Sequence, residues 1–352
     1  MSIKLAINGF GRIGRLAFRR AYEVGGFEVV AINDLVDAKT LAYLLKYDTT
    51  QGSWHVDDIK GVVTKDEQGN VLENYIEFKG VKIPVLGKKD PHDLKWSEYG
   101  VDIVLECTGR LKSHEDGDVH LHNGAKGVII SAPSSSKDIP TFVYGVNTDK
   151  LTKDMTIISG GSCTTNCLAP VVRVLQDKYG IKGGFMTTVH AYTNDQTILD
   201  LAKGNLRRGR AAACNIVPTT TGAAKAINLV VPELKGRLMG GAIRVPVPAG
   251  SLVDLSLVLG KKTTKEEINA ALKEASETTL KDVLGYTEDE IVSSDIVGRT
   301  EGSIFDATQT VVFDTPEGDQ HVKVVSWYDN EFSFTCQYVR LAGIYGKILG
   351  CK

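Results

Sequence analysis

The sequence predicts an α/β protein, with an N-terminal doubly wound parallel sheet of the Rossmann type and an α+β catalytic domain with a mainly antiparallel sheet. Three observations support this fold class. The chain has 352 residues, more than a single domain usually holds. A strand, a glycine turn and a helix follow one another at its start. The second half is rich in strand patterns that do not alternate regularly with helices.

The dinucleotide-binding order of elements is present at the start of the chain. A strand is expected over residues 3–8, the turn Gly9-Phe-Gly11-Arg-Ile-Gly14 follows, and a helix is expected over residues 15–24. Gly9 permits the tight turn, Gly11 lets the backbone approach a pyrophosphate, and Gly14 lets helix and strand pack closely. A purely structural glycine turn is the alternative.

The next strand, expected over residues 27–32, decides between these two interpretations. It is followed by Asp34, 20 residues beyond Gly14, where a carboxylate accepts hydrogen bonds from the adenosine ribose. The same carboxylate repels the 2′-phosphate of NADP. We therefore expect NAD as the cofactor.

The remaining first half continues with α/β elements. We expect a helix at 39–46, a hairpin-like region at 59–86, a helix beginning at Asp90-Pro91, and strands at 101–106 and 127–131. Thr108-Gly109 and Ser131 follow parallel strands at the edge where open sheets bind ligands, although ordinary turn chemistry explains them equally well. Three histidines, His114, His120 and His122, are expected to be exposed on a polar helix.

A cysteine is expected at the start of a central helix. Residues 159–170 read Ser-Gly-Gly-Ser-Cys-Thr-Thr-Asn-Cys-Leu-Ala-Pro, and helical apolar spacing follows. Backbone N–H groups and the helix dipole would lower the pKa of Cys163 from roughly 8.5 towards neutrality. The hydroxyl groups of Ser162 and Thr164 beside the sulfur suit an anion. The alternative is a serine cap before a buried helix in which Cys163 and Cys167 pack.

Further chemistry-bearing residues follow this helix. His190, in a strand-like run, is either structural or the base that activates Cys163. A long polar loop from Thr193 carries the arginine cluster Arg207, Arg208 and Arg210, and such loops are usually functional. Thr219-Thr-Thr-Gly222 precedes a helix expected at 223–229, and Arg244 interrupts an apolar run. Two phosphate sites are indicated, with a solvated or subunit-contact surface as the alternative for the arginine cluster.

The chain closes with four expected elements: a helix at 265–277, strands at 308–313 and 321–327, and an apolar helix at 332–349. This last helix is expected to pack on the first domain. The predicted domains are therefore residues 1–162, completed by residues 331–352, and residues 163–330.

Composition excludes several classes of protein. Hydrophobic residues make up 42% and charged residues 24%, which argues against disordered and fibrous chains. No apolar stretch reaches the ~18 residues of a membrane helix. The net charge of −2 gives no reason to expect a nucleic-acid partner, and no Cys or His pair completes a zinc site with Cys163 and Cys167. The scattered cysteines and the absence of a signal pattern lead us to expect a cytoplasmic protein.

These motifs resemble the phosphorylating glyceraldehyde-3-phosphate dehydrogenase family along essentially the whole chain. The resembling segments are Ile-Asn-Gly-Phe-Gly-Arg-Ile-Gly-Arg, Ser-Cys-Thr-Thr-Asn-Cys-Leu-Ala-Pro, Thr-Thr-Thr-Gly-Ala-Ala-Lys-Ala and Trp-Tyr-Asp-Asn-Glu. The resemblance implies oxidation of D-glyceraldehyde 3-phosphate to 1,3-bisphosphoglycerate with inorganic phosphate and NAD, in glycolysis or gluconeogenesis. The implied intermediates on Cys163 are a hemithioacetal and a thioester.

The resemblance also implies residue roles, with Cys163 as nucleophile and His190 as base. The residues implied at the cofactor are Gly9, Gly11, Arg12, Ile13, Gly14, Asp34, Lys89, Ser131 and Asn330. Those implied at the substrate phosphate are Thr193, Asp195 and Arg244. Those implied at the attacking phosphate are Ser162, Thr164, Arg208, Thr221 and Gly222. A homotetramer is implied as well, in which residues 193–216 help to build a neighbour's cofactor site.

Three departures from the family pattern stand out. Gly160-Gly161 replaces Asn-Ala, Leu201-Ala202 replaces Leu-Pro, and Phe334 replaces a tyrosine. Two other functions are open: erythrose-4-phosphate dehydrogenase, and a redox-sensing or adhesive binding role that uses Cys163 without turnover. A thiol sensor, however, requires neither phosphate site.

Overall fold

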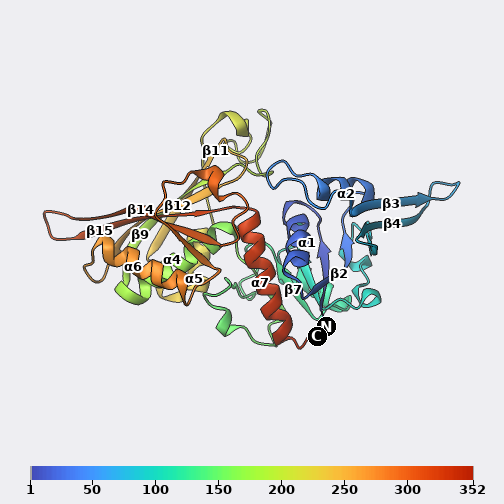
Figure 1. The fold of residues 1–352 in the computed structure, drawn as a ribbon, viewed down its shortest axis with the longest axis horizontal. Coiled ribbons are helices and arrows are strands. Elements are labelled where there is room, and N and C mark those ends of the chain that lie inside the picture. The colour runs from blue at the N-terminus through green and yellow to red at the C-terminus, as the bar shows by residue number, and fades with distance from the viewer. Residues whose placement is uncertain (1, 352) are drawn as a thin grey trace. The chain divides into compact units, whose positions relative to one another are not determined.

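The computed structural model describes residues 2–351, which form two compact units (Figure 1). Within the described chain, unit 1 holds residues 2–142, 150–161 and 338–351, and unit 2 holds residues 143–149 and 162–337. Unit 1 is therefore discontinuous in sequence. None of the helices within residues 2–351 has the length and apolar character needed to cross a bilayer.

Unit 1 is built on a five-stranded parallel sheet with the order β2-β1-β6-β7-β8. The strands are β1 (Ile3–Asn8), β2 (Phe27–Asn33), β6 (Ile103–Glu106), β7 (Gly127–Ile130) and β8 (Ile157–Ser159). The helices are α1 (Arg12–Val24), α2 (Ala38–Lys46) and α3 (His114–His122). Strand order and parallel pairing confirm the predicted Rossmann-type sheet.

Burial explains why these short segments form strands. β6 and β7 each consist of four fully buried residues, as expected of parallel strands covered on both faces. The helix expected at Asp90-Pro91 is instead a single 3₁₀ turn, Pro91–Asp93, because the backbone is already extended at Leu94. The hairpin-like region forms a separate three-stranded antiparallel sheet of β3 (Ile59–Lys65), β4 (Val71–Phe78) and β5 (Val81–Pro84).

Unit 2 contains a seven-stranded sheet with the order β10-β11-β9-β12-β15-β14-β13. Its strands are β9 (Ile181–Ala191), β10 (Val217–Thr219), β11 (Leu238–Val245), β12 (Ser251–Leu259), β13 (Leu284–Thr287), β14 (Ser303–Asp314) and β15 (Gln320–Tyr328). β11 pairs with β9, and β13 with β14, in parallel, and the other four pairs are antiparallel. The expectation of a mainly antiparallel sheet is confirmed.

The central strand β12 was missed by the sequence analysis. Its sequence, Ser-Leu-Val-Asp-Leu-Ser-Leu-Val-Leu, buries every second side chain, so the period of two was the available signal. β8, β10 and β13 were missed too, because three or four residues carry little pattern.

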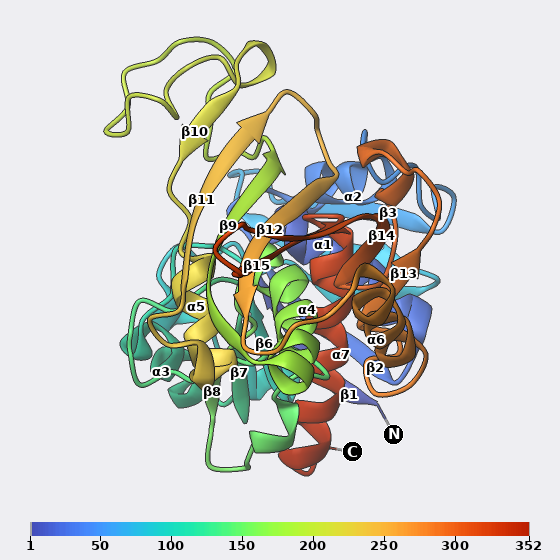
Figure 2. The ribbon, with the colours of Figure 1, turned by 90° about the vertical axis from the view of Figure 1, so that its left-hand side faces the viewer.

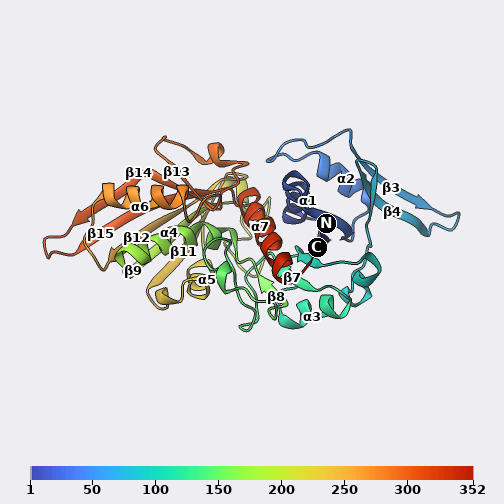
Figure 3. The ribbon, with the colours of Figure 1, turned by 60° about the horizontal axis from the view of Figure 1, so that its bottom comes forward.

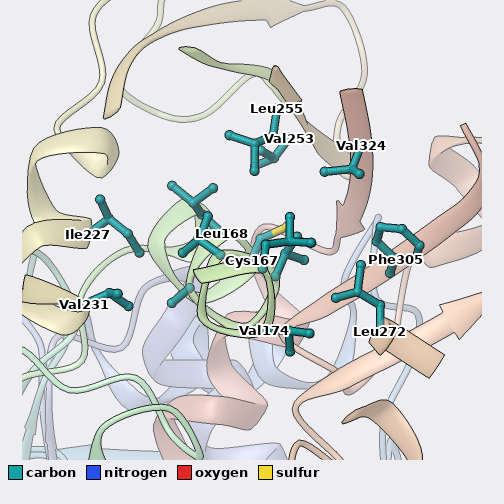
Figure 4. Packing of buried hydrophobic residues seen from close by; sticks show 14 of the residues in the cluster. Cys167, Leu168, Val174, Ile227, Val231, Val253, Leu255, Leu272, Phe305 and Val324 are labelled. Atoms are coloured by element: carbon teal, nitrogen blue, oxygen red, sulfur yellow. The ribbon is translucent and has the colours of Figure 1, made fainter. Parts of the chain in front are cut away.

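Three helices of unit 2 pack on one face of this sheet: α4 (Cys163–Tyr179), α5 (Ala223–Val230) and α6 (Lys265–Glu277) (Figure 3). Figure 4 shows Leu168 and Val174 of α4 among sheet side chains such as Val253 and helix side chains such as Leu272. All four are less than a tenth exposed. The helix α4 that begins at Cys163 is thus packed into a continuous core.

The last helix, α7 (Phe332–Ile348), runs from unit 2 into unit 1. In its second half, the Tyr338 hydroxyl donates to the Ile129 carbonyl and the Tyr345 hydroxyl donates to the Met155 carbonyl at 2.7 Å. These bonds fasten the end of the chain to the parallel sheet.

The expectation of three exposed histidines is wrong for His120. Its side chain is fully buried, whereas those of His114 and His122 are 47% and 79% exposed. The physical reason is helical periodicity, because Gly117 and His120 lie on the buried face of α3.

Candidate active site

Cys163 is the first residue of α4, as predicted. Ser162 is the N-cap, and its Oγ accepts a hydrogen bond from Thr165 N at 3.1 Å. The Cys163 Sγ lies 3.4 Å from Nε2 of His190, the second-to-last residue of β9. The structure therefore brings the two predicted groups together, although 27 positions separate them in sequence.

The charge state of this pair differs from the sequence-based expectation. Burial, reinforced by the positive charge of Arg244, lowers the pKa of His190 to about 3, so the imidazole is neutral. Burial also raises the pKa of Cys163, and Arg244 and the N–H groups at the helix start oppose this only in part. The expected lowering of the Cys163 pKa is wrong for this geometry because desolvation outweighs the helix dipole. A neutral thiol thus faces a neutral base.

Arg244 lies on β11 directly opposite His190 in the parallel register. Its Nη1 is 2.6 Å from His190 Nδ1 and donates to the Ala191 carbonyl at 2.9 Å. His190 Nδ1 is itself 2.6 Å from that carbonyl. The two contacts of Nδ1 select different tautomers, since Nδ1 that accepts from Arg244 places the ring proton on Nε2, whereas Nδ1 that donates to Ala191 O leaves Nε2 as an acceptor aimed at the thiol. Base catalysis requires the second tautomer, in which Arg244 donates to Ala191 O alone.

Arg208 is fixed by three neighbours. It forms an ion pair with Asp195, its Nε donates to Thr219 Oγ1 at 2.9 Å, and its Nη2 donates to the Thr220 carbonyl at 3.1 Å. The residues that follow Thr220 open α5, where Gly222 is the N-cap and Thr221 Oγ1 accepts from the Ala223 N–H at 3.2 Å. The Arg208 guanidinium is thereby held against the residues that precede the start of α5.

The hydroxyl of Thr164 is directed into the core. Thr164 is 4% exposed, and its Oγ1 is 2.9 Å from the hydroxyl of Tyr328, which also lies 2.8 Å from Thr188 Oγ1. The Tyr328 ring stands edge-on to His190, with centroids 5.8 Å apart. Neither Tyr328 nor Thr188 was identified from the sequence. Thr188 lies in the strand-like run around His190, and Tyr328 directly follows the strand expected at 321–327.

Asn330 is connected to the catalytic strand through Ser251. Its Oδ1 accepts from Gly250 N at 3.2 Å and from Ser251 Oγ at 3.1 Å, and Ser251 Oγ accepts from Ala191 N at 3.0 Å. With Oδ1 occupied in this way, the amide nitrogen of Asn330 is the group left to donate. Ser251 begins the missed strand β12, so it was not identified from the sequence.

A cavity of about 530 Å³ opens in unit 1 at the carboxyl ends of β1, β2 and β6. Four predicted cofactor residues line it: Gly9, Gly11, Asp34 and Lys89. Asp34 is held in place, because Oδ2 accepts from Phe10 N at 2.8 Å and Oδ1 accepts from Val36 N at 3.1 Å. Both oxygens retain a lone pair for a ligand hydroxyl.

The three glycines of the turn fit the roles assigned to them. Gly9 has a φ of +90°, and a Cβ there would lie 2.6 Å from Thr108 N. A Cβ on Gly14 would lie 2.2 Å from the Gly9 carbonyl, whereas one on Gly11 would meet nothing within 4 Å. Space is therefore left at Gly11, where a pyrophosphate must approach the backbone.

Two other residues predicted at the cofactor, Arg12 and Ser131, are not among those that line the cavity. The Arg12 side chain pairs with Asp48 and donates to Thr50 Oγ1 at 2.6 Å, so its guanidinium is already engaged within the protein. The groups of Arg12 and Ile13 that could bind a phosphate are therefore their backbone N–H groups in the first turn of α1. Ser131 follows β7 and donates its N–H to the Glu106 carbonyl at 3.0 Å.

Comparison with known proteins agrees with this geometry. Residues 162–330 match "Glyceraldehyde 3-phosphate dehydrogenase, C-terminal domain", and residues 3–114 match "Glyceraldehyde 3-phosphate dehydrogenase, NAD binding domain". A glyceraldehyde-3-phosphate dehydrogenase of Clostridium pasteurianum is 54% identical over 347 residues, covering 98% of this chain and 99% of the relative. The chain belongs to the glyceraldehyde-3-phosphate dehydrogenase family. A member from Streptococcus pyogenes serotype M1 is also 54% identical, over 99% of both chains.

Within this dehydrogenase family, the matched N-terminal domain makes NAD the cofactor.

The departure from the family pattern at Gly160-Gly161 has a local structural reason. Gly161 has a φ of +70°, a region that strains an alanine, and a Cβ on Gly160 would lie 3.0 Å from the Tyr338 ring. This chain therefore enters α4 through a backbone that only glycine adopts without strain.

Proposed function

We propose that this chain is a phosphorylating, NAD-dependent glyceraldehyde-3-phosphate dehydrogenase of glycolysis and gluconeogenesis. The observation that carries the proposal is the Cys163 Sγ at a helix start, 3.4 Å from the neutral Nε2 of His190. The family match does not favour erythrose-4-phosphate dehydrogenase or a purely redox-sensing or adhesive role.

The proposed reaction begins with Cys163 as nucleophile. The sulfur forms a bond to the aldehyde carbon while the thiol proton passes to His190 Nε2, which gives a hemithioacetal. The backbone N–H of Cys163 and the His190 imidazolium stabilise the oxygen of this intermediate. NAD, when bound, supplies the hydride acceptor. The thioester left on Cys163 is then attacked by inorganic phosphate, and the carbon–sulfur bond breaks to release 1,3-bisphosphoglycerate.

The two phosphate groups are assigned to the two fixed guanidinium groups. Arg244 and Thr193 would bind the substrate phosphate, since Arg244 is already oriented beside the catalytic base. Arg208, Ser162 and the helix start at Thr221-Gly222 would bind the attacking phosphate. Asp195 and Thr164 act indirectly in this proposal, because Asp195 pairs with Arg208 and Thr164 contacts Tyr328.

The cofactor is assigned to the cavity of unit 1. The backbone at Gly9, Gly11, Arg12, Ile13 and Gly14 would bind the pyrophosphate and Asp34 the ribose, with Lys89 and Ser131 nearby. Asn330 would donate its amide nitrogen to the nicotinamide carboxamide. The division into residues 1–162 with 331–352, and residues 163–330, is part of the same proposal.

An assay of NADH absorbance tests the proposed reaction. We expect reduction of NAD with glyceraldehyde 3-phosphate to depend on inorganic phosphate, because phosphate must release the thioester. Equal steady-state rates with and without phosphate would contradict the proposal. Erythrose 4-phosphate serves as the competing aldehyde, and a higher kcat/KM for it would favour the other dehydrogenase.

Substitution Arg244→Ala is expected to affect the phosphorylated aldehyde selectively. Loss of a charge-assisted contact to phosphate should raise KM for glyceraldehyde 3-phosphate by about 10- to 100-fold. Because Arg244 also contacts His190, kcat should fall for every aldehyde, so the ratio of kcat/KM between glyceraldehyde 3-phosphate and glyceraldehyde is the measurement. Arg237→Ala, at the residue that directly precedes β11, is the matched control. An unchanged ratio would show that the phosphate binds elsewhere.

Substitution Asp34→Asn is expected to weaken the preference for NAD over NADP. It removes the charge that repels a 2′-phosphate, a repulsion worth on the order of several kcal/mol in a partly buried site, and keeps an acceptor for Phe10 N. Asp37→Asn, three residues later at the exposed N-cap of α2, is the control. A wild-type kcat/KM for NADP within about threefold of that for NAD would contradict the role of Asp34.

A homotetramer is proposed for the assembled enzyme. The loop after β9, expected to be polar, extends beyond the sheet (Figure 2) and exposes Ile198, Leu199, Leu201, Leu206 and Ile216 by 65–88%. Such a cluster of apolar side chains is typical of a contact with another chain. Sedimentation as a monomer at micromolar concentration would contradict this assignment.

A cytoplasmic location is proposed from the glycolytic role and the six free cysteines.

A further inference from the structure

A buried polar cluster lies under the cofactor cavity, around Glu106 at the end of β6. Glu106 is 2% exposed. Its Oε2 accepts from Asn8 Nδ2 at 2.6 Å and lies 3.2 Å from His120 Nε2. Its Oε1 accepts from the Thr108 N–H at 2.8 Å and from the Thr108 hydroxyl. The four contacts match the four lone pairs of an ionised carboxylate.

The protonation of His120 is fixed by Trp96. The Trp96 Nε1 lies 3.0 Å from His120 Nδ1, and an indole nitrogen can only donate. Nδ1 must therefore be the acceptor, which places the proton of the neutral ring on Nε2. The proton on Nε2 then points at Glu106. Both His120 and Trp96 have 0% exposure, so neither group has water as an alternative partner.

Two partners of Glu106 line the cofactor cavity. Asn8 and Thr108 are both part of its wall. The backbone of Thr108 lies so close to Gly9 that a Cβ on this glycine would be 2.6 Å from Thr108 N. Asn8 Oδ1 in turn accepts from Asn33 Nδ2 at 2.8 Å, which connects the ends of β1 and β2. The position of Glu106 therefore sets the position of the phosphate-binding turn against β6.

We propose that His120 is a positioning residue for NAD binding, which acts by donating from Nε2 to Glu106 and thereby fixing Thr108 and Asn8 at the floor of the cavity. His120 touches no part of the cavity itself. Without its donor, the buried carboxylate loses one of four hydrogen bonds and is free to shift, and the turn at Gly9 shifts with it. The proposal rests on the proposed placement of NAD at this cavity.

Two substitutions separate the two hydrogen bonds of His120. In His120→Gln, the amide nitrogen can replace Nε2 and donate to Glu106, while the bond from Trp96 is lost. In His120→Asn, the shorter amide can still accept from Trp96 but does not reach Glu106. His122→Asn, two residues along α3 with a 79% exposed side chain, is the matched control.

The dissociation constant of NAD is measured by calorimetry on the full-length protein, with thermal unfolding recorded for each variant. We expect His120→Asn to weaken NAD by about tenfold, the equivalent of one buried hydrogen bond to a charged group, and His120→Gln to stay within about threefold of wild type. His122→Asn should equal wild type.

Results that would overturn the role of His120 differ from those that would overturn the placement of NAD. If His120→Gln weakens NAD as much as His120→Asn, or if a folded His120→Asn binds NAD like wild type, the inference is wrong. If His120→Asn does not fold, His120→Gln alone decides, because loss of NAD affinity in that variant overturns the inference. The placement of NAD is tested separately by Asp34→Asn, since an unchanged ratio of NAD to NADP affinity in that variant would reject the cavity itself.

Discussion

Replacement of Cys163 by serine is expected to abolish oxidation of glyceraldehyde 3-phosphate, with a loss of kcat of more than about a thousandfold. A serine hydroxyl is far less acidic than a thiol, so it is poorly ionised at neutral pH and is a weak nucleophile in this position. Serine differs from cysteine only by oxygen in place of sulfur, and Cys163 is not among the residues that line the cofactor cavity. NAD affinity should therefore change by no more than a few-fold. The measurements are NADH formation and calorimetric NAD binding.

Two other cysteines provide controls for this result. Cys214 is exposed, and Cys214→Ser should leave kcat unchanged. Cys167 lies one turn further along α4, with Sγ 3.6 Å from Ser303 Oγ, and Cys167→Ser should alter stability more than turnover. Retention of more than a few per cent of kcat in Cys163→Ser would reject the assignment of the nucleophile.

Substitution His190→Asn is expected to lower kcat by about 100- to 10,000-fold, the usual contribution of a general base. Burial and the charge of Arg244 lower the pKa of His190, so the imidazole is unprotonated throughout the neutral pH range. Because so low a pKa makes it a weak base by itself, it accepts the thiol proton only as the facing sulfur becomes negatively charged. Without this base, the thiolate forms only as pH approaches the pKa of Cys163 itself, which burial raises. Alkylation of Cys163 by iodoacetamide should therefore slow at neutral pH, and its pH profile should move to higher pH.

Alkylation rates between pH 5 and 10 check this prediction without requiring turnover. His122→Asn, on a surface helix of unit 1, should reproduce the wild-type profile. An alkylation profile of His190→Asn that coincides with wild type would mean that Nε2 does not assist the thiol, despite the distance of 3.4 Å.

Much of the fold could be predicted from local pattern. β1 was predicted to the residue over Ile3–Asn8, as was α6 over Lys265–Glu277, because an apolar strand before a glycine turn and a capped amphipathic helix are both encoded within a few positions. The missed strand β12 shows the limit. Its pattern was present, but only its pairing with β9 and β15 makes it the centre of a sheet.

The residues of the candidate site also fall into two groups, those that local sequence predicts and those that depend on distant partners. The glycine turn, Asp34 and the position of Cys163 at a helix start follow from spacing along the chain, because each depends on neighbours in sequence. Ser251, Tyr328 and Trp96 could not be found in that way, since their partners lie 24 to 164 residues away.

The sequence by itself determined the family, the cofactor class and which cysteine begins a helix, since these depend on local residue order. Only the tertiary structure decided the protonation states. Whether Cys163 rests as a thiol or thiolate, and whether His120 is a solvated side chain or a buried donor, depends on how far each is removed from water and on which charges face it. Burial of this kind arises from segments distant in sequence, so no local pattern records it.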